Sequence, residues 1–182
     1  MLIARKPITL PDDPLPTISS MKVLGVRLSS DLRWNTHIRE ATRRASQRMH
    51  VLRMLKPHTS CKELHAVYMA QIASIFDYCC PAFGKLPKKH CALLRKVQRR
   101  AHRIIFGDDI RCDCTFDGFE LRRATLSLKL FQNIMNNPRH ILYHRTPKLM
   151  SRSHKLTSFY CRTSTRQHSF FPHATLLHNS QK

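Results

Sequence analysis

The chain is poor in glycine and in acidic residues. Only four of its 182 residues are glycine, which disfavours a turn-rich all-β fold and the glycine-rich loops that cradle phosphates. Asp and Glu number 11 against 32 Lys and Arg, for a formal net charge of +21, and no acidic residue follows Glu120. This excess is typical of proteins that bind a polyanion, because Lys and Arg neutralise phosphates. The alternative is a basic protein whose charges are only solvated.

Long apolar runs are also missing. No window of the chain approaches the roughly 18 apolar residues that a membrane span needs, and the first twenty residues lack the apolar segment of a secretory signal. Seven cysteines at irregular spacing fit reduced thiols better than a disulfide framework. We therefore expect a nuclear or cytoplasmic protein that is not secreted and has no membrane partner.

Residue patterns that would carry catalysis or bind a metal are absent. Cys112 and Cys114 have no second cysteine pair at the spacing of a zinc site. His140 and His144 are four residues apart, but the nearby Pro138 disfavours a helix that would bring them together. No Ser–His–Asp or Cys–His spacing stands out. We expect no catalytic residue, no metal site and no cofactor.

Hydrophobic periodicity predicts a mainly α fold. Residues 1–20 carry four prolines and are interpreted as an extended lead-in. A short apolar strand containing Val23, Leu24, Val26 and Leu28 follows, in which Gly25 indicates a bulge or a close backbone approach. Apolar residues at helical spacing then predict about four helices, at about 34–56, 60–78, 87–106 and 119–137. Short connections favour antiparallel packing of neighbours.

The last segment, residues 138–182, has no clear periodicity and is expected to be a basic, weakly ordered tail. The chain therefore divides into a lead-in (1–20), a strand with a helical bundle (21–137) and the tail (138–182). The stretch "SFFPHATLL" is the part of the tail expected to dock on the bundle. Aromatic residues alternate with arginines in this tail, which is compatible with base stacking and equally with anchoring of the tail. These residues are Phe159, Tyr160, Arg162, Arg166, Phe170 and Phe171.

The third predicted helix separates its charges from its apolar residues. At about 100° per residue, Leu94, Val97, Ala101, Ile104 and Ile105 share one arc. The opposite arc is basic and consists of Lys88, Lys89, Arg95, Lys96, Arg99, Arg100 and Arg103. No acidic residue lies between Asp77 and Asp108. Because a face with one sign of charge repels itself, we interpret this face as a candidate surface for phosphate contacts; a solvated face is the alternative.

Five segments along the chain resemble the region that follows the polymerase palm in non-LTR (LINE-type) retrotransposon reverse transcriptases. They are "MKVLGVRLSSDLRWNTHIREATRRASQRMHVLRMLK", "VYMAQIASIFDYCCPAF", "LRKVQRRAHRIIFG", "LKLFQNIMNNP" and "CRTSTRQHSFFPHA". They occur in family order across roughly residues 20–178. The resemblance is carried by this order, since no single motif is decisive.

The resemblance implies roles for two parts of the chain. The "LGV" strand is similar to the primer-grip element, which touches the primer end, and its residues here are Leu24, Gly25 and Val26. The helices that follow would form a thumb-like bundle holding a primer–template duplex. In the family, the fingers and the palm with its metal-binding aspartates precede this element, whereas about twenty residues precede it here. We therefore expect a truncated fragment that is not an enzyme by itself, with nucleic acid and a missing palm domain as partners.

The motif "RIIFGDD" places Asp108 and Asp109 in a pattern that looks like the paired-aspartate turn of a polymerase. In a polymerase such a turn joins two strands and would precede the "LGV" element. Here it follows a predicted helix of about twenty residues, and Gly107 stands where a helix C-terminal glycine belongs. We interpret the motif as the end of the third helix.

Two other interpretations stay open. The chain is a non-functional or protein-interaction remnant, or it is related to the N-terminal region of an AlkB-homologue family, which "KVLGVRLSSDLRWNTHI" resembles. That family joins an iron and 2-oxoglutarate dioxygenase to a methyltransferase. The dioxygenase holds iron through a His-x-Asp pair and a distant His, and the chain contains no His-x-Asp and no glycine-rich loop for a methyl donor.

Overall fold

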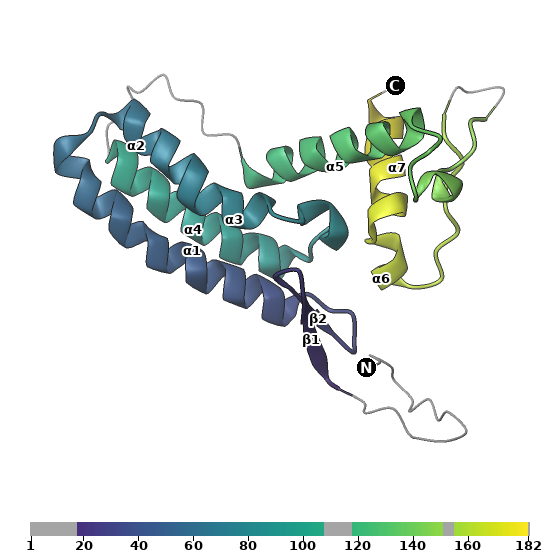
Figure 1. The fold of residues 1–182 in the computed structure, drawn as a ribbon, viewed down its shortest axis with the longest axis horizontal. Helices are drawn as coiled ribbons and strands as arrows, with labels where there is room; N and C mark the ends of the chain where they lie inside the picture. The colour runs from purple at the N-terminus through teal and green to yellow at the C-terminus, as the bar shows by residue number, and fades with distance from the viewer. Residues whose placement is uncertain (1–17, 108–117, 151–154, 182) are drawn as a thin grey trace.

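The computed structural model describes residues 18–107, 118–150 and 155–181. In this part of the chain the fold is mainly α-helical with one small β-hairpin at the N-terminal side (Figure 1). Three long helical segments pack side by side, and a fourth extends from them to a helix near the C-terminus. The predicted fold class, mainly α with a short N-terminal β element, is confirmed.

The predicted single strand is in fact a hairpin. β1 (Ser20–Val23) pairs antiparallel with β2 (Val26–Ser29), and Leu24 and Gly25 form the two-residue turn between them. Their φ values of 46° and 80° are those of a turn that matches the twist of the two strands. Gly25 therefore marks a chain reversal and not a bulge. The sequence pattern concealed this because leucine rarely adopts positive φ.

The first two helical segments have nearly the predicted bounds. α1 (Asn35–Leu55) is followed by a 3₁₀ turn that contains Pro57. The second segment consists of α2 (Cys61–Tyr68), a π-helical turn (Met69–Ala73) and α3 (Ser74–Asp77). Ser60 caps α2, because its hydroxyl accepts from the Glu63 amide while the Glu63 carboxylate accepts from the Ser60 amide.

The basic helix α4 (Lys88–Phe106) lies beside α1 and runs parallel to it. At one end the Asn35 Oδ1 and His90 Nε2 atoms of the two helices are 2.7 Å apart. At the other end, the Cys61 thiol that follows α1 contacts the Ile105 carbonyl oxygen. The two helices are parallel because α2 and α3 carry the chain back between them (Figure 1). Antiparallel packing therefore holds only for segments that are consecutive in sequence.

One hydrophobic core joins these helices. α1 contributes residues at helical spacing, including Ile38, Ala45 and Leu52, all 3% exposed or less. α4 contributes Leu94, Val97, Ala101, Ile105 and Phe106. The apolar arc predicted for α4 is thus the buried one, with Ile104 partly buried at its edge. Gly107, with φ of 65°, ends the helix as predicted.

The C-terminal segment is more ordered than the sequence indicated. α5 (Phe119–Asn136) extends away from the bundle, and α6 (Ser164–Gln167) and α7 (Phe170–Ser180) follow. A second cluster forms around Phe131 of α5, which is 0% exposed and packs with Leu156 and Ala174. The expectation of a weakly ordered tail is therefore wrong for α7, because this short helix is stabilised by its contacts with α5 and not by a long periodic pattern.

Of the tail aromatics, Phe170 and Phe171 pack on this second cluster, and the Phe159 and Phe171 ring centres are 6.3 Å apart. These contacts favour the anchoring interpretation for those three residues. Tyr160 differs, since 83% of it is exposed. Every helix within residues 18–107, 118–150 and 155–181 is too short or too polar to cross a lipid bilayer.

Candidate nucleic-acid interface

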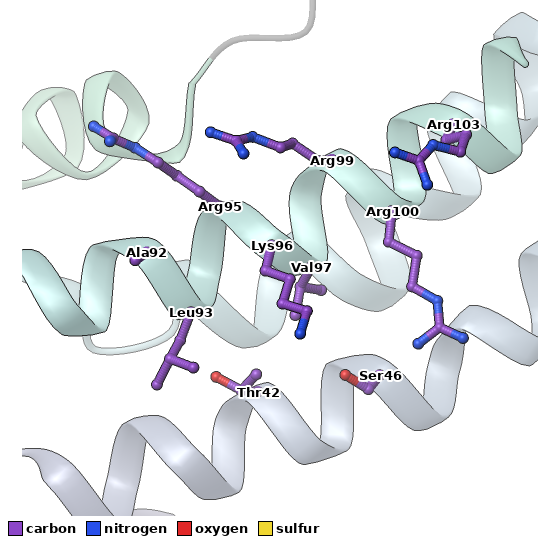
Figure 2. A pocket seen from close by; sticks show the side chains of 10 residues that line it. All are labelled: Thr42, Ser46, Ala92, Leu93, Arg95, Lys96, Val97, Arg99, Arg100 and Arg103. Atoms are coloured by element: carbon purple, nitrogen blue, oxygen red, sulfur yellow. The ribbon is translucent and has the colours of Figure 1, made fainter. Parts of the chain in front are cut away.

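A groove with a volume of about 960 Å³ runs between α1 and α4 (Figure 2). Five of the seven basic residues predicted for the third helix line it: Arg95, Lys96, Arg99, Arg100 and Arg103. Thr42 and Ser46 of α1 form the opposite side, and Ala92, Leu93 and Val97 supply a carbon surface between the charges. The other two predicted residues, Lys88 and Lys89, are exposed in the first turn of α4 and do not line the groove.

The cations of the groove point in two directions. Figure 2 shows the Lys96 and Arg100 side chains reaching across toward α1, whereas Arg95 and Arg99 extend away from it. This division follows from the helix, because residues four apart share a face. A polyanion lying in the groove would therefore meet Lys96 and Arg100 at its inner side, with Arg99 on the outer rim.

Arg95 is already paired. Its guanidinium lies 2.7 Å from the carboxylate of Glu120 in the first turn of α5. The bond to Glu120 raises the pKa of Arg95, and the bond from Arg95 lowers the pKa of Glu120. The sequence offered no sign of this pair, because the two residues are separated by the end of α4 and the following loop. Arg95 is thus less available to a phosphate than its neighbours.

The other four cations of the groove have no such partner within the part of the chain that the structure describes. The side chains of Lys96, Arg99, Arg100 and Arg103 are exposed, and no carboxylate of the described residues lies within ion-pair distance of them. We call these four residues the groove cations. They are the part of the predicted basic face that both lines the groove and has no carboxylate partner among the described residues.

α1 adds positive charge that the sequence analysis did not single out. Arg39, Arg43 and Arg53 are exposed and lie at helical spacing along the same side of α1 as Thr42 and Ser46. Burial is the main cause that lowers the pKa of His90, and the positive charges of Lys89 and Arg39 lower it further. Arg39 therefore lies near the beginning of α4. The spacing of arginines in "REATRRASQRMHVLR" was the available signal.

The hairpin that contains the predicted primer-grip-like residues is fastened to the same bundle. The Arg27 amide donates to Nδ1 of His37 at 3.3 Å, and the Tyr78 hydroxyl donates to the Leu24 carbonyl oxygen at 2.6 Å. Val26 is buried, whereas Gly25 is exposed and Leu24 is 83% exposed. The hairpin lies at the end of the bundle where α1 and α4 begin (Figure 1).

His37 is suited to its role as an acceptor. Burial and, secondarily, the Arg44 charge lower its pKa, against an opposing effect of Glu40. The neutral ring can therefore accept the Arg27 amide at neutral pH. Glu40 pairs with the Arg27 side chain at 2.7 Å, so that backbone and side chain of one residue both hold the hairpin on α1.

Burial also governs the junction between α5 and the loop before α4. Arg123 is 7% exposed and donates to the Gly84 carbonyl oxygen at 2.8 Å. Burial lowers the pKa of Arg123 and raises the pKa of the neighbouring Cys80 thiol to about 11. A thiol with that pKa is protonated at neutral pH and is a poor nucleophile. We assign this junction a structural role.

The remaining candidates are dispersed or undescribed. His140 lies in a turn and His144 in a 3₁₀ turn (Tyr143–Arg145), so no α-helix brings them together. Within residues 18–107, 118–150 and 155–181, no group of three or more His, Cys, Asp or Glu side chains is arranged to hold a metal ion. The "DD" pair and the "CDC" cysteines lie outside the described residues.

Comparison with known proteins gives one informative similarity. The chain is 34% identical over 102 residues to a probable RNA-directed DNA polymerase from transposon BS of Drosophila melanogaster. The match covers 54% of this chain and 11% of the length of that protein. It supports a reverse-transcriptase relationship. No protein-family model matches the chain, and no solved structure matches it.

Proposed function

We propose that this chain binds nucleic acid in the groove between α1 and α4 through contacts to the phosphate backbone. The observation that carries the proposal is the row of groove cations, Lys96, Arg99, Arg100 and Arg103, which face solvent without a carboxylate partner among the described residues. The similarity to a transposon polymerase supports nucleic acid as the polyanion. Contacts of this kind position a strand without reading its sequence.

The role within a polymerase would be that of the region after the palm. In this proposal the α1–α4 bundle is a thumb-like support for a primer–template duplex, and Leu24, Gly25 and Val26 of the hairpin are the primer-grip-like residues. From Lys96 to Arg103 the groove cations span about 10 Å of the helix, which matches roughly three phosphate spacings of one strand at about 3.4 Å each, or about four phosphates. The rigid fastening of the hairpin by Tyr78 and His37 suits a positioning role.

The proposal includes no catalysis by this chain alone. Two-metal phosphoryl transfer needs a set of positioned carboxylates, and the groove lining contains cations, hydroxyls and carbon. Primer extension with magnesium should therefore stay at the background of a protein-free control. Turnover of 2-oxoglutarate with iron, the activity of the AlkB-homologue alternative, should also stay at background. Activity in either assay would replace the binding role with an enzymatic one.

The direct test is the salt dependence of binding. If each of the four groove cations neutralises one phosphate, the slope of log affinity against log salt is about −3.6. Affinity for a duplex of about 20 base pairs then falls roughly 150-fold between about 50 and about 200 mM salt. Fluorescence anisotropy with a labelled duplex measures both quantities. Binding that does not change with salt would refute the proposal.

A matched pair of variants locates the interface. The triple variant K96E/R100E/R103E should lose most of the affinity and most of the slope. The control variant K129E/R139E/R166E makes the same change of charge and residue type at exposed positions outside the groove, and it should retain most of the affinity. Equal losses in the two variants would mean that net charge, and not the groove, is responsible.

A second candidate function, protein interaction, is favoured by one feature. The turn after α5 presents Ile141 with 84% of its surface exposed, next to the partly exposed Leu142 and Tyr143. The Tyr143 and Arg145 amides donate to backbone oxygens inside this turn, so the apolar residues are held outward. If this turn is the functional surface, replacing Ile141 with Asp would abolish association with a partner while duplex binding stays unchanged.

A further inference from the structure

The inner surface of the groove contains two hydroxyl groups as well as cations. Thr42 and Ser46 lie one turn apart on α1, and Figure 2 shows both on the side of α1 that faces Lys96 and Arg100. One helical turn places them about 6 Å apart along the groove. Phosphate binding explains the cations, and a free hydroxyl can also donate to a phosphate, but a hydroxyl whose proton is already engaged cannot.

Toward a ligand in the groove, the hydroxyl of Thr42 can only accept a hydrogen bond. It donates its proton to the Ile38 carbonyl oxygen at 2.7 Å, so only its lone pairs face the groove. A phosphate oxygen is itself an acceptor and cannot bond to those lone pairs. The complementary group is a donor that lies beside a phosphate in a nucleic acid backbone. The ribose 2′-hydroxyl is such a donor, and deoxyribose lacks it.

Ser46 extends this surface. Its Oγ has no hydrogen-bond partner among the residues that the structure describes, so it can both donate and accept. Between the two helices lies Leu93, which is 37% exposed, with the 5% exposed Val97 beneath the surface of the groove. This carbon surface suits the C–H face of a sugar, while Lys96 and Arg100 reach the phosphates on either side. The groove therefore has a separate place for each part of a sugar–phosphate strand.

We propose that Thr42 and Ser46 make the groove select a ribose strand over a deoxyribose strand. The inference rests on the proposed function, since it assumes that the groove holds a sugar–phosphate backbone. The wide, shallow minor groove of A-form helices displays 2′-hydroxyls at its surface, where a shallow protein groove can reach them. Thr42 and Ser46 are thus specificity-determining residues, whereas the groove cations supply affinity for either kind of strand.

The test compares duplexes that share one sequence. RNA–RNA, DNA–DNA and 2′-O-methyl RNA duplexes of about 20 base pairs are measured by anisotropy at one salt concentration. The 2′-O-methyl duplex keeps the A-form shape but has lost the donor proton, so it separates shape from hydrogen bonding. We expect RNA to bind at least about fivefold more tightly than the other two, which is the typical net effect of one hydrogen bond.

Variants assign the preference to the two hydroxyls. T42V/S46A should weaken binding of RNA more than binding of DNA, so that the ratio of the two affinities falls to about one. The control is T125V, because Thr125 is exposed on α5 and donates to the Leu121 carbonyl oxygen four residues earlier, as Thr42 does to Ile38. T125V should retain the full preference for RNA.

The two proposals fail in different ways. If 2′-O-methyl RNA binds as tightly as RNA, or T42V/S46A keeps the preference, the selection of ribose is refuted while salt-dependent phosphate binding stands. If none of the duplexes binds with a steep dependence on salt, the proposed function is refuted, and the selection of ribose with it.

Discussion

The contact between Gly84 and His168 holds the C-terminal segment on the bundle, and replacing Gly84 with alanine should break it. A Cβ atom at Gly84 would lie 1.8 Å from the His168 carbonyl oxygen, where real Cβ atoms stay beyond 3.0 Å. The His168 carbonyl would have to retreat by at least 1.2 Å, the difference between these distances. The Lys85 amide, which donates to that oxygen at 2.9 Å, would then lose its acceptor.

The expected loss of stability has two main contributions. One net hydrogen bond contributes about 1 kcal/mol, and a non-glycine residue at the φ of 54° adds about 1–3 kcal/mol of backbone strain. We therefore expect Gly84→Ala to destabilise the docked C-terminal segment by about 2–4 kcal/mol. Thermal unfolding measures the effect, and hydrogen exchange of the α7 amides shows whether it is confined to that helix.

The control for this experiment is Gly118→Ala. Gly118 has a φ of −56°, and a Cβ there would meet no atom within 4 Å, so its substitution should change the stability by less than about 1 kcal/mol. If Gly84→Ala leaves both the melting temperature and the protection of α7 as they are in the wild type, the contact with His168 does not hold the segment, and our account of its docking is wrong.

Two further predictions concern the hairpin and its attachment. Leu24→Asn should stabilise the protein by about 1 kcal/mol in thermal unfolding, because asparagine tolerates positive φ better than leucine and the leucine side chain is exposed; a lower melting temperature would contradict the turn geometry. Protonation of His37 should weaken the attachment: since its folded-state pKa lies below 6.5, the unfolded chain takes up the proton first, and stability is lost as the pH falls from about 6.5 toward the folded-state pKa. The melting temperature of His37→Gln should therefore fall less than that of the wild type between about pH 7.5 and about pH 5; an equal fall in the two proteins would contradict this account of the attachment.

The parts of the fold that the sequence predicted are those controlled by local patterns. α4 was expected at about 87–106 and lies at Lys88–Phe106, because its apolar arc, its charges and the glycine at its end all indicate the same helix. The second helix was expected to begin at about residue 60, and Ser60 is the residue that caps it. In both cases the information lies within a few residues of the element that it determines.

The parts that were missed depend on contacts between distant residues. The pairing of Arg95 with Glu120 divides the predicted basic face, and no pattern within α4 reveals it. α7 is only 11 residues long, so its periodicity was weak, although Ser169 before the helix and Pro172 in its first turn are typical of a helix start. The contribution of α1 to the groove required knowing that α1 and α4 lie side by side.

The parallel direction of α1 and α4 gives the groove unequal ends. Each helix has a partial charge of about +0.5 at its N-terminus and about −0.5 at its C-terminus. Because both N-termini lie at the hairpin end, their partial charges add there, and neither helix has an acidic residue in its first turn to neutralise them. The helix dipoles therefore raise the electrostatic potential of the groove at the hairpin end and lower it at the other end. A polyanion bound in the groove would meet this added partial positive charge beside the turn that presents Leu24.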